Sequence, residues 1–379
     1  MLRLILGRSG TGKSTMIYNR IRNAGAQRRQ VLLVPDQNSY EAERALCTIT
    51  GNSASLYAEV LTFHRLCNRV FLQKGGLGVP EMDGGGRILM MHKAVKKAAS
   101  NGLLKVCRTA SDRPAFLKSL LATADELKSH CVSPDMLLEV AYEVEDPAGE
   151  KLSELAHICN FYNEFMDQSQ RLDPQDRLDR LAERLADGEW AREKDIWVDG
   201  FSDFSPQQMK VLELLMASAH SVTVALACEE SPEVGETEIF AAAHNTRYQL
   251  CSAARKVGLG TPEIVALDGV SKGLRRPALE FLEQRLFAYQ NRETGVQNGE
   301  LELFAARNPR SEVEWVAARI LRLVREEGYR FRDIGVVART FGDYSDLVEA
   351  VFGKYGVPVF CSGMHDILEK PVLSLIVGA

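Results

Sequence analysis

An eight-residue glycine-rich segment near the N-terminus, Gly7–Ser14, places the strongest constraint on the fold of this chain. It reads GRSGTGKS and fits the pattern GxxxxGK[ST]. An apolar run typical of a buried strand (residues 2–6) precedes it, and residues 14–23 follow with Ile17 and Ile21 on one face of a predicted helix. A strand, a glycine-rich turn and a helix in this order surround phosphate oxygens with backbone N–H groups. The segment therefore predicts an α/β fold built around a phosphate loop.

The residues of this loop have distinct expected roles. Glycines allow the backbone N–H groups to turn inward, Lys13 would bridge the β- and γ-phosphates, and Ser14 would hold Mg²⁺. We therefore expect ATP and Mg²⁺ as ligands. The predicted phosphate-binding residues are Gly7, Arg8, Ser9, Gly10, Thr11, Gly12, Lys13 and Ser14. The alternative is a glycine-rich turn that binds no ligand.

A second metal-binding carboxylate is expected at the end of another buried strand, and Asp199 follows the apolar residues 196–198. In enzymes that hydrolyse ATP the next residue is usually a glutamate that orients the attacking water, but here it is Gly200. No catalytic base is therefore assigned, and hydrolysis should be slow unless Asp203 or Glu229 replaces the glutamate. The alternative is that Asp199 only caps a turn.

Strand-like apolar runs alternate with helical patterns, which is typical of a parallel sheet with crossover helices. The predicted strands are residues 2–6, 30–34, 58–62, 195–198, 221–226 and 263–267. Between residues 84 and 192 these runs vanish, and amphipathic segments at 87–100, 115–130 and 152–170 predict a helical insertion.

A further α/β unit is expected from Gly299 onward. It would contain strands at 301–304, 333–338 and 357–360 and helices at 311–327 and 344–355, with Ser311 and Glu314 at capping-box spacing. The predicted domains are therefore 1–83 with 193–298, the insertion 84–192, and an incomplete domain 299–379. The apolar residues 371–379 lack a cap, so we expect the sequence to be part of a longer chain.

Two other strand ends carry residues suited to single-stranded nucleic acid. Residues 31–34 lead into a polar loop that contains Gln37, and residues 58–62 end in Thr62, Phe63, His64 and Arg65. Ligands of open α/β sheets lie at such strand ends, where an aromatic ring can stack on a base and polar groups reach phosphates. These residues are the DNA-binding candidates; helix capping and core packing are the alternatives.

Composition narrows the class of protein. The net charge is −5, no apolar run approaches the roughly 20 residues of a membrane span, and the N-terminus has no secretory pattern, so we expect a cytoplasmic protein without a membrane partner. The eight cysteines lack metal-ligand spacing. Residues 84–118 carry eight bases and one acid, whereas residues 135–154 carry seven acids and one base, which indicates either an anion-binding face or solvated helix surfaces.

Five segments together resemble the AddB subunits of bacterial AddAB helicase–nucleases, and the similarity extends over essentially the whole chain. They span residues 7–14, 32–43, 60–70, 196–215 and 308–340. More distantly they resemble motifs I, Ia, Ib and II of superfamily 1 UvrD-like helicases. The resemblance implies a RecA-like domain 1A, a helical subdomain 1B at 84–192 and the beginning of a RecA-like domain 2A at 299–379.

The resemblance also implies a function: processing of double-strand DNA ends for recombinational repair, as partner of an AddA-type motor subunit, with binding of single-stranded and duplex-end DNA. The iron–sulfur cluster and the nuclease of that family would lie beyond Ala379. Residues 227–230 lack the Gln and Arg that couple nucleotide to DNA in helicases. Together with Gly200, this favours an ATP-binding subunit with weak or no motor activity over an active translocase; a P-loop kinase for a small metabolite is a third hypothesis. The sequence does not decide whether this chain is an enzyme.

Overall fold

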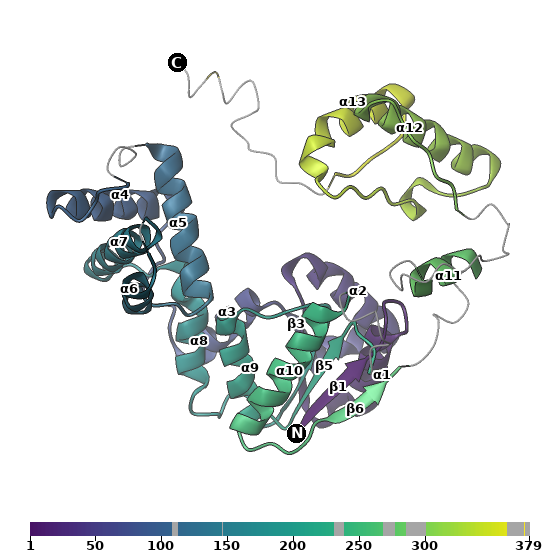
Figure 1. Ribbon diagram of the computed structural model, residues 1–379. Helices are drawn as coiled ribbons and strands as arrows, with labels where there is room; N and C mark the ends of the chain where they lie inside the picture. Colours follow the sequence, from purple (N-terminus) through teal and green to yellow (C-terminus); the bar gives the residue numbers. More distant parts are fainter. Residues whose placement is uncertain are drawn as a thin grey trace. The chain divides into compact units, whose positions relative to one another are not determined.

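The chain forms two compact units, Met1–Gly295 and Val296–Ala379 (Figure 1). The computed structural model describes residues 1–107, 113–145, 147–230, 239–267, 277–285, 301–361 and 375. The first unit contains the sheet and most of the helices, and it holds every residue that the sequence predicts for ATP, Mg²⁺ or DNA binding.

A six-stranded sheet forms the centre of the first unit, and every pair of neighbouring strands is parallel. The strands are β1 (Leu2–Leu6), β2 (Arg29–Leu33), β3 (Ala58–Leu61), β4 (Lys194–Val198), β5 (Ser221–Leu226) and β6 (Glu263–Ala266), in the order β3-β2-β4-β5-β1-β6. All six predicted strands are confirmed, with bounds that differ by at most one residue at either end. Because the strands are parallel, their carboxyl ends lie at one edge of the sheet and their amino ends at the other.

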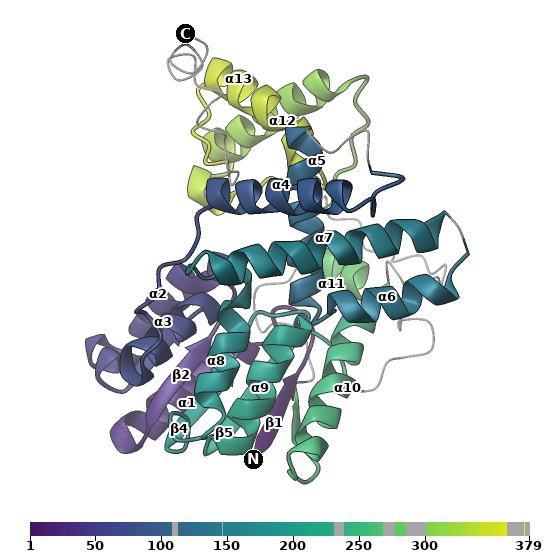
Figure 2. The same ribbon diagram turned by 90° about the vertical axis from the view of Figure 1, so that its left-hand side faces the viewer.

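Helices cover both faces of this sheet. Consecutive residues of a strand point to opposite faces, so Leu4 and Ile5 of β1 lie in two separate hydrophobic clusters. The helices are α1 (Lys13–Ala24) and α2 (Ser39–Thr50) on the Ile5 face, and α3 (Phe63–Lys74), α8 (Arg177–Leu185), α9 (Pro206–Ser218) and α10 (Ala241–Lys256) on the other. Figure 2 shows α8, α9 and α10 side by side. Helix α8 falls within the predicted insertion, yet its Leu181 and Leu185 belong to the core of the sheet.

Four helices between residues 84 and 168 form a separate core. They are α4 (Gly84–Ser100), α5 (Pro114–Ser129), α6 (Pro134–Glu143) and α7 (Ala148–Gln168). Met91, Leu121 and Ile158 are buried in a hydrophobic cluster shared by α4, α5 and α7, α6 packs along α7, and the described residues of this stretch contain no strand. The three predicted helices are confirmed. Across the described part of the chain, no helix combines the length and the apolar character needed to cross a bilayer.

Some of the basic and acidic side chains in this stretch pair with each other. Lys97 pairs with Glu164 at 2.8 Å and Lys105 with Glu150 at 2.7 Å. Glu154, 3% exposed, accepts hydrogen bonds from the backbone N–H groups of residues 105, 106 and 107. Glu150 and Glu154 of α7 therefore hold the segment that follows α4. Part of the opposite charge of residues 84–118 and 135–154 is thus paired within the protein.

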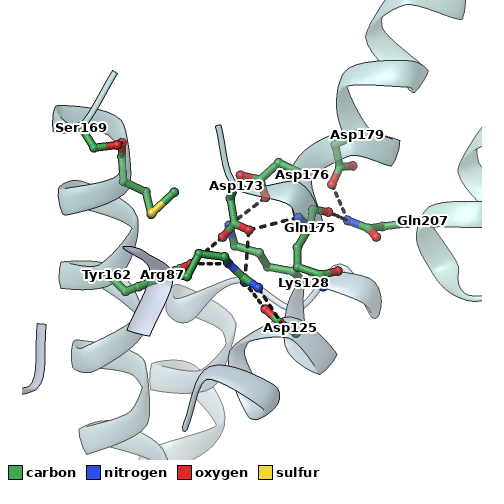
Figure 3. A network of polar contacts seen from close by, with 11 residues as sticks. Arg87, Asp125, Lys128, Tyr162, Ser169, Asp173, Gln175, Asp176, Asp179 and Gln207 are labelled. Carbon is green, nitrogen blue, oxygen red and sulfur yellow. Dashed lines mark hydrogen bonds and ion pairs between the residues drawn. The ribbon is translucent and has the colours of Figure 1, made fainter. Parts of the chain in front are cut away.

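A buried polar group, here called the Asp173 cluster, joins α4, α5 and α7 to the short 3₁₀ turn η5 (Pro174–Asp176) (Figure 3). Asp173 accepts hydrogen bonds from the Tyr162 hydroxyl at 2.9 Å and from the Lys128 ammonium at 3.0 Å. Arg87 lies 3.1 Å from the same carboxylate and also pairs with Asp125. The cluster thus fixes three helices to one turn of the chain.

The turn η5 is held from its other side by α9. The side-chain amide of Gln207 donates to the Gln175 carbonyl oxygen at 3.2 Å and to the Asp179 carboxylate at 2.8 Å (Figure 3). Gln207 is 3% exposed. One short segment, residues 173–179, therefore connects the four-helix core with the helices that cover the sheet.

The second unit departs from its prediction. It contains α12 (Pro309–Glu326) and α13 (Ser345–Tyr355), which confirms both expected helices, but its described residues form no strand. The stretches 301–304, 333–338 and 357–360 are therefore not strands, because a strand requires a ladder of hydrogen bonds with a neighbour and none forms here. The capping box of α12 is Asn308 with Ser311, not Ser311 with Glu314.

Residues 371–379, except 375, lie outside the described residues. One further described helix, α11 (Pro277–Arg285), belongs to the first unit.

Candidate functional site

The glycine-rich loop connects β1 to α1 at the carboxyl edge of the sheet, and its backbone requires glycine at several positions. Gly10 has φ of 81° and Gly12 has φ of 93°, in the left-handed region that L side chains rarely adopt. At Gly7 an added Cβ would lie 2.6 Å from Thr11 Oγ1 and 3.0 Å from the Leu267 carbonyl oxygen. The glycines therefore serve the turn itself, as the sequence pattern predicts.

Lys13, the first residue of α1, lies back over this loop. Its ammonium donates to the carbonyl oxygens of Gly7 at 2.7 Å and Arg8 at 2.8 Å. Burial lowers the pKa of Lys13, while the Asp199 carboxylate opposes the shift. A phosphate that bound to Lys13 would replace these two carbonyl oxygens with charged acceptors.

Ser14 and Asp199 meet at the start of α1. Asp199 follows β4, is 8% exposed, and accepts a hydrogen bond from the Ser14 side chain. Burial raises the pKa of Asp199, and the Ser14 hydrogen bond and the Lys13 charge oppose this shift. Strands β1 and β4 lead into Ser14 and Asp199 at the same edge of the sheet, with only β5 between them. The fold therefore brings together two residues that are far apart in the sequence.

The donor set at this point fits Mg²⁺ that arrives with a nucleotide. Mg²⁺ prefers oxygen ligands and is commonly held by one or two carboxylates together with substrate phosphates. Ser14 and Asp199 offer a hydroxyl and a carboxylate, both oxygen donors. Among the described residues there is no group of three or more His, Cys, Asp or Glu side chains that could hold a metal by themselves.

Gly200 is restricted more strongly than the sequence indicates. Its φ is 83°, and an added Cβ would lie 3.1 Å from Asn38 Nδ2 and 3.3 Å from Pro35 Cδ. A glutamate at this position would combine a left-handed backbone with a crowded side chain. The backbone after Asp199 is therefore built for glycine.

The two residues that could replace the missing base occupy different surroundings. Asp203 is exposed and accepts a hydrogen bond from the Ser202 hydroxyl at 3.2 Å. Glu229, which follows β5, forms an ion pair with Arg8 of the loop. The Arg8 guanidinium also lies 5.4 Å from the centre of the Phe240 ring. Glu229 is thus already engaged by a cation.

Thr62 and Phe63 have structural roles. The Thr62 side chain caps α3 by accepting a hydrogen bond from the Arg65 backbone N–H at 3.3 Å. Phe63 is 7% exposed, and its ring packs edge-on against Phe201 with centroids 5.7 Å apart. The Phe63 ring is therefore covered in this structure, and both residues make the contacts that capping and packing require, while their role in DNA binding stays a prediction.

The other DNA-binding candidates remain at the surface of the same edge. Gln37 lies in the 3₁₀ turn η2 (Asp36–Asn38) and is exposed. His64 is exposed and contacts the Arg177 guanidinium, with 2.6 Å between Arg177 Nη1 and His64 Nδ1. Arg65 pairs with Glu43 at 2.5 Å. Their role in DNA binding stays a prediction.

Sequence reasoning missed three residues beside the loop. Asn38 lies beside Gly200, Phe240 lies against Arg8, and the buried Cys228 follows β5 close enough to Lys13 to raise its pKa slightly against the effect of burial. Cys228 carried a positional signal, since it stands two residues after a predicted strand. Asn38 lies within residues 32–43, which carry the family resemblance, but nothing singles it out there, and nothing in the sequence around Phe240 marks that residue.

The comparisons with known proteins agree with this architecture. A parallel α/β sheet whose first strand leads into a glycine-rich loop and a helix is consistent with a RecA-like fold. Residues 4–283 match the family model described as "ADDB, N-terminal", so the chain belongs to this family. The resemblance to AddB subunits that the sequence motifs indicate is thereby confirmed.

Relatives in several bacteria support the same assignment. The chain is 33% identical over 388 aligned positions to the B subunit of the ATP-dependent helicase/deoxyribonuclease of Acetivibrio thermocellus, covering 100% of this chain and 33% of that protein. The corresponding subunits of Thermoanaerobacter sp. strain X514 and Desulforudis audaxviator, which carry the same name, are each 34% identical, over 99% and 100% of this chain and 33% of theirs. The chain thus spans about a third of the length of these curated relatives.

Proposed function

We propose that this chain is the N-terminal, nucleotide-binding region of an AddB-type subunit that binds single-stranded DNA while broken duplex ends are processed for recombinational repair, with little or no motor activity of its own. The observation that carries the proposal is the arrangement of Lys13, Ser14 and Asp199 at the carboxyl edge of the sheet, next to a Gly200 whose backbone disfavours a glutamate.

Nucleotide binding would use groups that already point at the loop. The Lys13 ammonium would exchange two carbonyl oxygens for phosphate oxygens, which are stronger acceptors because they are charged. The N-terminus of α1 adds the partial positive charge of its backbone N–H groups. Ser14 and Asp199 would hold Mg²⁺, which neutralises charge on the phosphates.

Slow hydrolysis follows from the lack of a positioned base. A water that attacks the γ-phosphate must be oriented by a residue within hydrogen-bond reach. Position 200 has no side chain, and Glu229 is paired with Arg8. We therefore infer that nucleotide stabilises a conformation of this subunit and does not drive movement along DNA. An AddA-type partner would supply the motor, in keeping with relatives that are named as one subunit of a helicase/deoxyribonuclease.

An active ATP-driven translocase is the competing function. It requires Glu229 to leave Arg8, or Asp203 to approach the nucleotide, so that one of them serves as the base. Both functions predict nucleotide binding and differ only in turnover.

The experiment measures ATP binding by calorimetry and ATP turnover by phosphate release, with and without single-stranded DNA. The variants are Lys13→Ala, Asp199→Asn and, as matched control, Lys151→Ala, which removes an exposed lysine of α7. We expect Lys13→Ala to abolish binding, Asp199→Asn to weaken its Mg²⁺ dependence, and Lys151→Ala to change neither. Wild-type turnover should be slow and insensitive to DNA.

Two results would contradict the proposal. Vigorous turnover that rises with DNA would establish the translocase. No nucleotide binding by the wild-type chain would mean that the loop serves the fold alone.

A further inference from the structure

A pocket of about 590 Å³ lies at the edge of the sheet opposite the glycine-rich loop. It is formed where β2, β3, β4 and β5, four neighbouring strands, begin. We call it the amino-edge pocket. Its charged and titratable lining residues are Arg28, Arg29, Arg192, Glu193, Lys194 and His220.

Positive charge dominates this lining, since four cations face one acid, Glu193. Arg28 and Arg192 are exposed, and neither forms an ion pair or a side-chain hydrogen bond with another described residue. The Asp187 carboxylate pairs with Lys74, and its interaction with Arg192 is electrostatic and longer than an ion pair. Two guanidinium groups at one pocket thus retain their full hydrogen-bonding capacity.

Two other titratable groups of the pocket, Arg29 and His220, are held in place. Arg29 donates to the Leu56 carbonyl oxygen at 2.6 Å. His220 Nδ1 lies 2.9 Å from Asp195 Oδ1. These contacts shape the pocket walls, so that an incoming ligand would meet pre-positioned groups.

Lys194 lies between the pocket and the core. Its ammonium is 4.2 Å from the centre of the Trp190 ring. Burial lowers the pKa of Lys194, Glu59 and Glu193 oppose this shift, and Arg29 and Lys74 add to it.

Helix ends do not account for these cations. Cations often gather at helix C-termini to satisfy the last carbonyl groups, and α1 ends beside this pocket. Here the buried side-chain amide of Gln30 does so, donating to the Ile21 carbonyl oxygen at 3.1 Å and to that of Gly25 at 3.0 Å. Trp197 in turn donates to Gln30 Oε1 at 3.1 Å. Arg28 and Arg192 have no such task.

We propose that the amino-edge pocket binds a phosphate group, with Arg28 and Arg192 as its principal ligands. Arginine presents a planar fork of N–H donors that matches two oxygens of a phosphate, and several such cations favour a multiply charged anion. The phosphate belongs either to the backbone of a nucleic acid strand or to a small phosphate compound. This inference is independent of nucleotide binding at Lys13, because it rests on the opposite edge of the sheet.

The test uses the whole 379-residue chain carrying Lys13→Ala, so that phosphate binding at the glycine-rich loop does not contribute. In this background Arg28→Ala/Arg192→Ala is compared with a control, Arg255→Ala/Arg325→Ala, which removes two exposed arginines that do not line the pocket. Pyrophosphate binding is measured by calorimetry, and binding of a labelled single-stranded oligonucleotide by fluorescence anisotropy over a range of salt concentrations. Thermal unfolding verifies that each variant folds.

We expect the pocket variant to lose about tenfold in affinity, a loss of two charge-assisted contacts, while the control changes little. If the phosphate belongs to a DNA backbone, the oligonucleotide is affected and the slope of log K against log salt falls by about 0.7 for each lost contact. If it belongs to a small compound, only pyrophosphate is affected. Equal losses in pocket and control variants, or no loss with either probe, would overturn the proposal.

Discussion

The Asp173 cluster offers the sharpest test of what holds the four-helix core together, through the substitution Asp173→Asn. The Asp173 side chain is 0% exposed and lies against two cations, Arg87 and Lys128. Removing one member of a buried ion pair costs about 3–5 kcal/mol because the remaining charge stays buried. Each cation keeps a second carboxylate, Asp125 for Arg87 and Asp176 for Lys128, so we expect the lower end, about 3 kcal/mol.

Hydrogen exchange measured by mass spectrometry is the suitable assay. The three tryptophans, Trp190, Trp197 and Trp315, lie outside the four-helix core and would not report on it. A loss of about 3 kcal/mol would speed the slowest exchanging amides of α4, α5 and α7 by roughly a hundredfold. Peptides from β1 and β5 should keep their protection.

The matched control is Asp167→Asn, which neutralises an exposed aspartate of α7, one of the three helices that the cluster joins. It should change exchange by less than a factor of about two, because exposed charges contribute little. If Asp173→Asn accelerates the exchange of these helices no more than Asp167→Asn does, the cluster does not stabilise them and the reasoning is refuted.

The same residue gives the core a pH dependence of defined sign. Burial raises the pKa of Asp173, but the Lys128 ammonium, the Gln175 N–H and Arg87 outweigh it, so the pKa in the folded chain is lowered. A group of this kind stabilises the fold above its unfolded pKa of about 3.9, and the contribution is lost as pH falls below that value. Asp176, whose pKa burial raises, acts in the opposite sense. The wild-type chain should therefore lose protection below about pH 4 more steeply than Asp173→Asn.

Three further substitutions test single contacts by thermal or denaturant unfolding. Gly200→Ala should destabilise by about 1–2 kcal/mol from its left-handed backbone, and by more than Gly258→Ala, whose φ is also positive but whose added Cβ meets nothing within 4 Å; equal effects would argue against crowding. Thr62→Ala should cost about 1 kcal/mol through loss of the α3 cap, whereas Thr123→Ala, inside α5, should cost little; no difference would exclude the cap. Glu154→Gln should cost about 1–3 kcal/mol and make residues 103–107 easier to cleave by protease, and an unchanged cleavage rate would contradict its role.

The first unit was largely predictable from sequence because its signals are local. Each of the six strands is a short apolar run between turn residues, and the loop has a fixed pattern of glycines. The partnership of Ser14 with Asp199 followed from the rule that parallel strands end at one edge. These features depend on a few neighbouring residues or on topology alone.

The remaining features depend on contacts between distant segments. Whether Phe63 is exposed is decided by Phe201, which lies more than a hundred residues further along the chain. The apolar residues 357–360 look like a strand, but a strand is defined by its neighbour, and no neighbour is present among the described residues. The crowding at Gly200 comes from Pro35 and Asn38. No pattern within a single segment encodes such pairings.

The position of Lys13 has a consequence for how such loops evolve. Its ammonium is bonded to two carbonyl oxygens of its own loop, so the lysine contributes to the fold in the absence of nucleotide. Replacing it removes the Lys13 donor from the Gly7 carbonyl oxygen, while that of Arg8 still accepts from Thr11, and this loss costs free energy even in a chain that never hydrolyses ATP. Selection for folding alone can therefore preserve the lysine after selection for turnover has ceased. An intact GxxxxGK[ST] pattern is then evidence of a turn whose stability depends on the lysine. Whether such a protein is a working motor has to be judged from the residue that follows the aspartate.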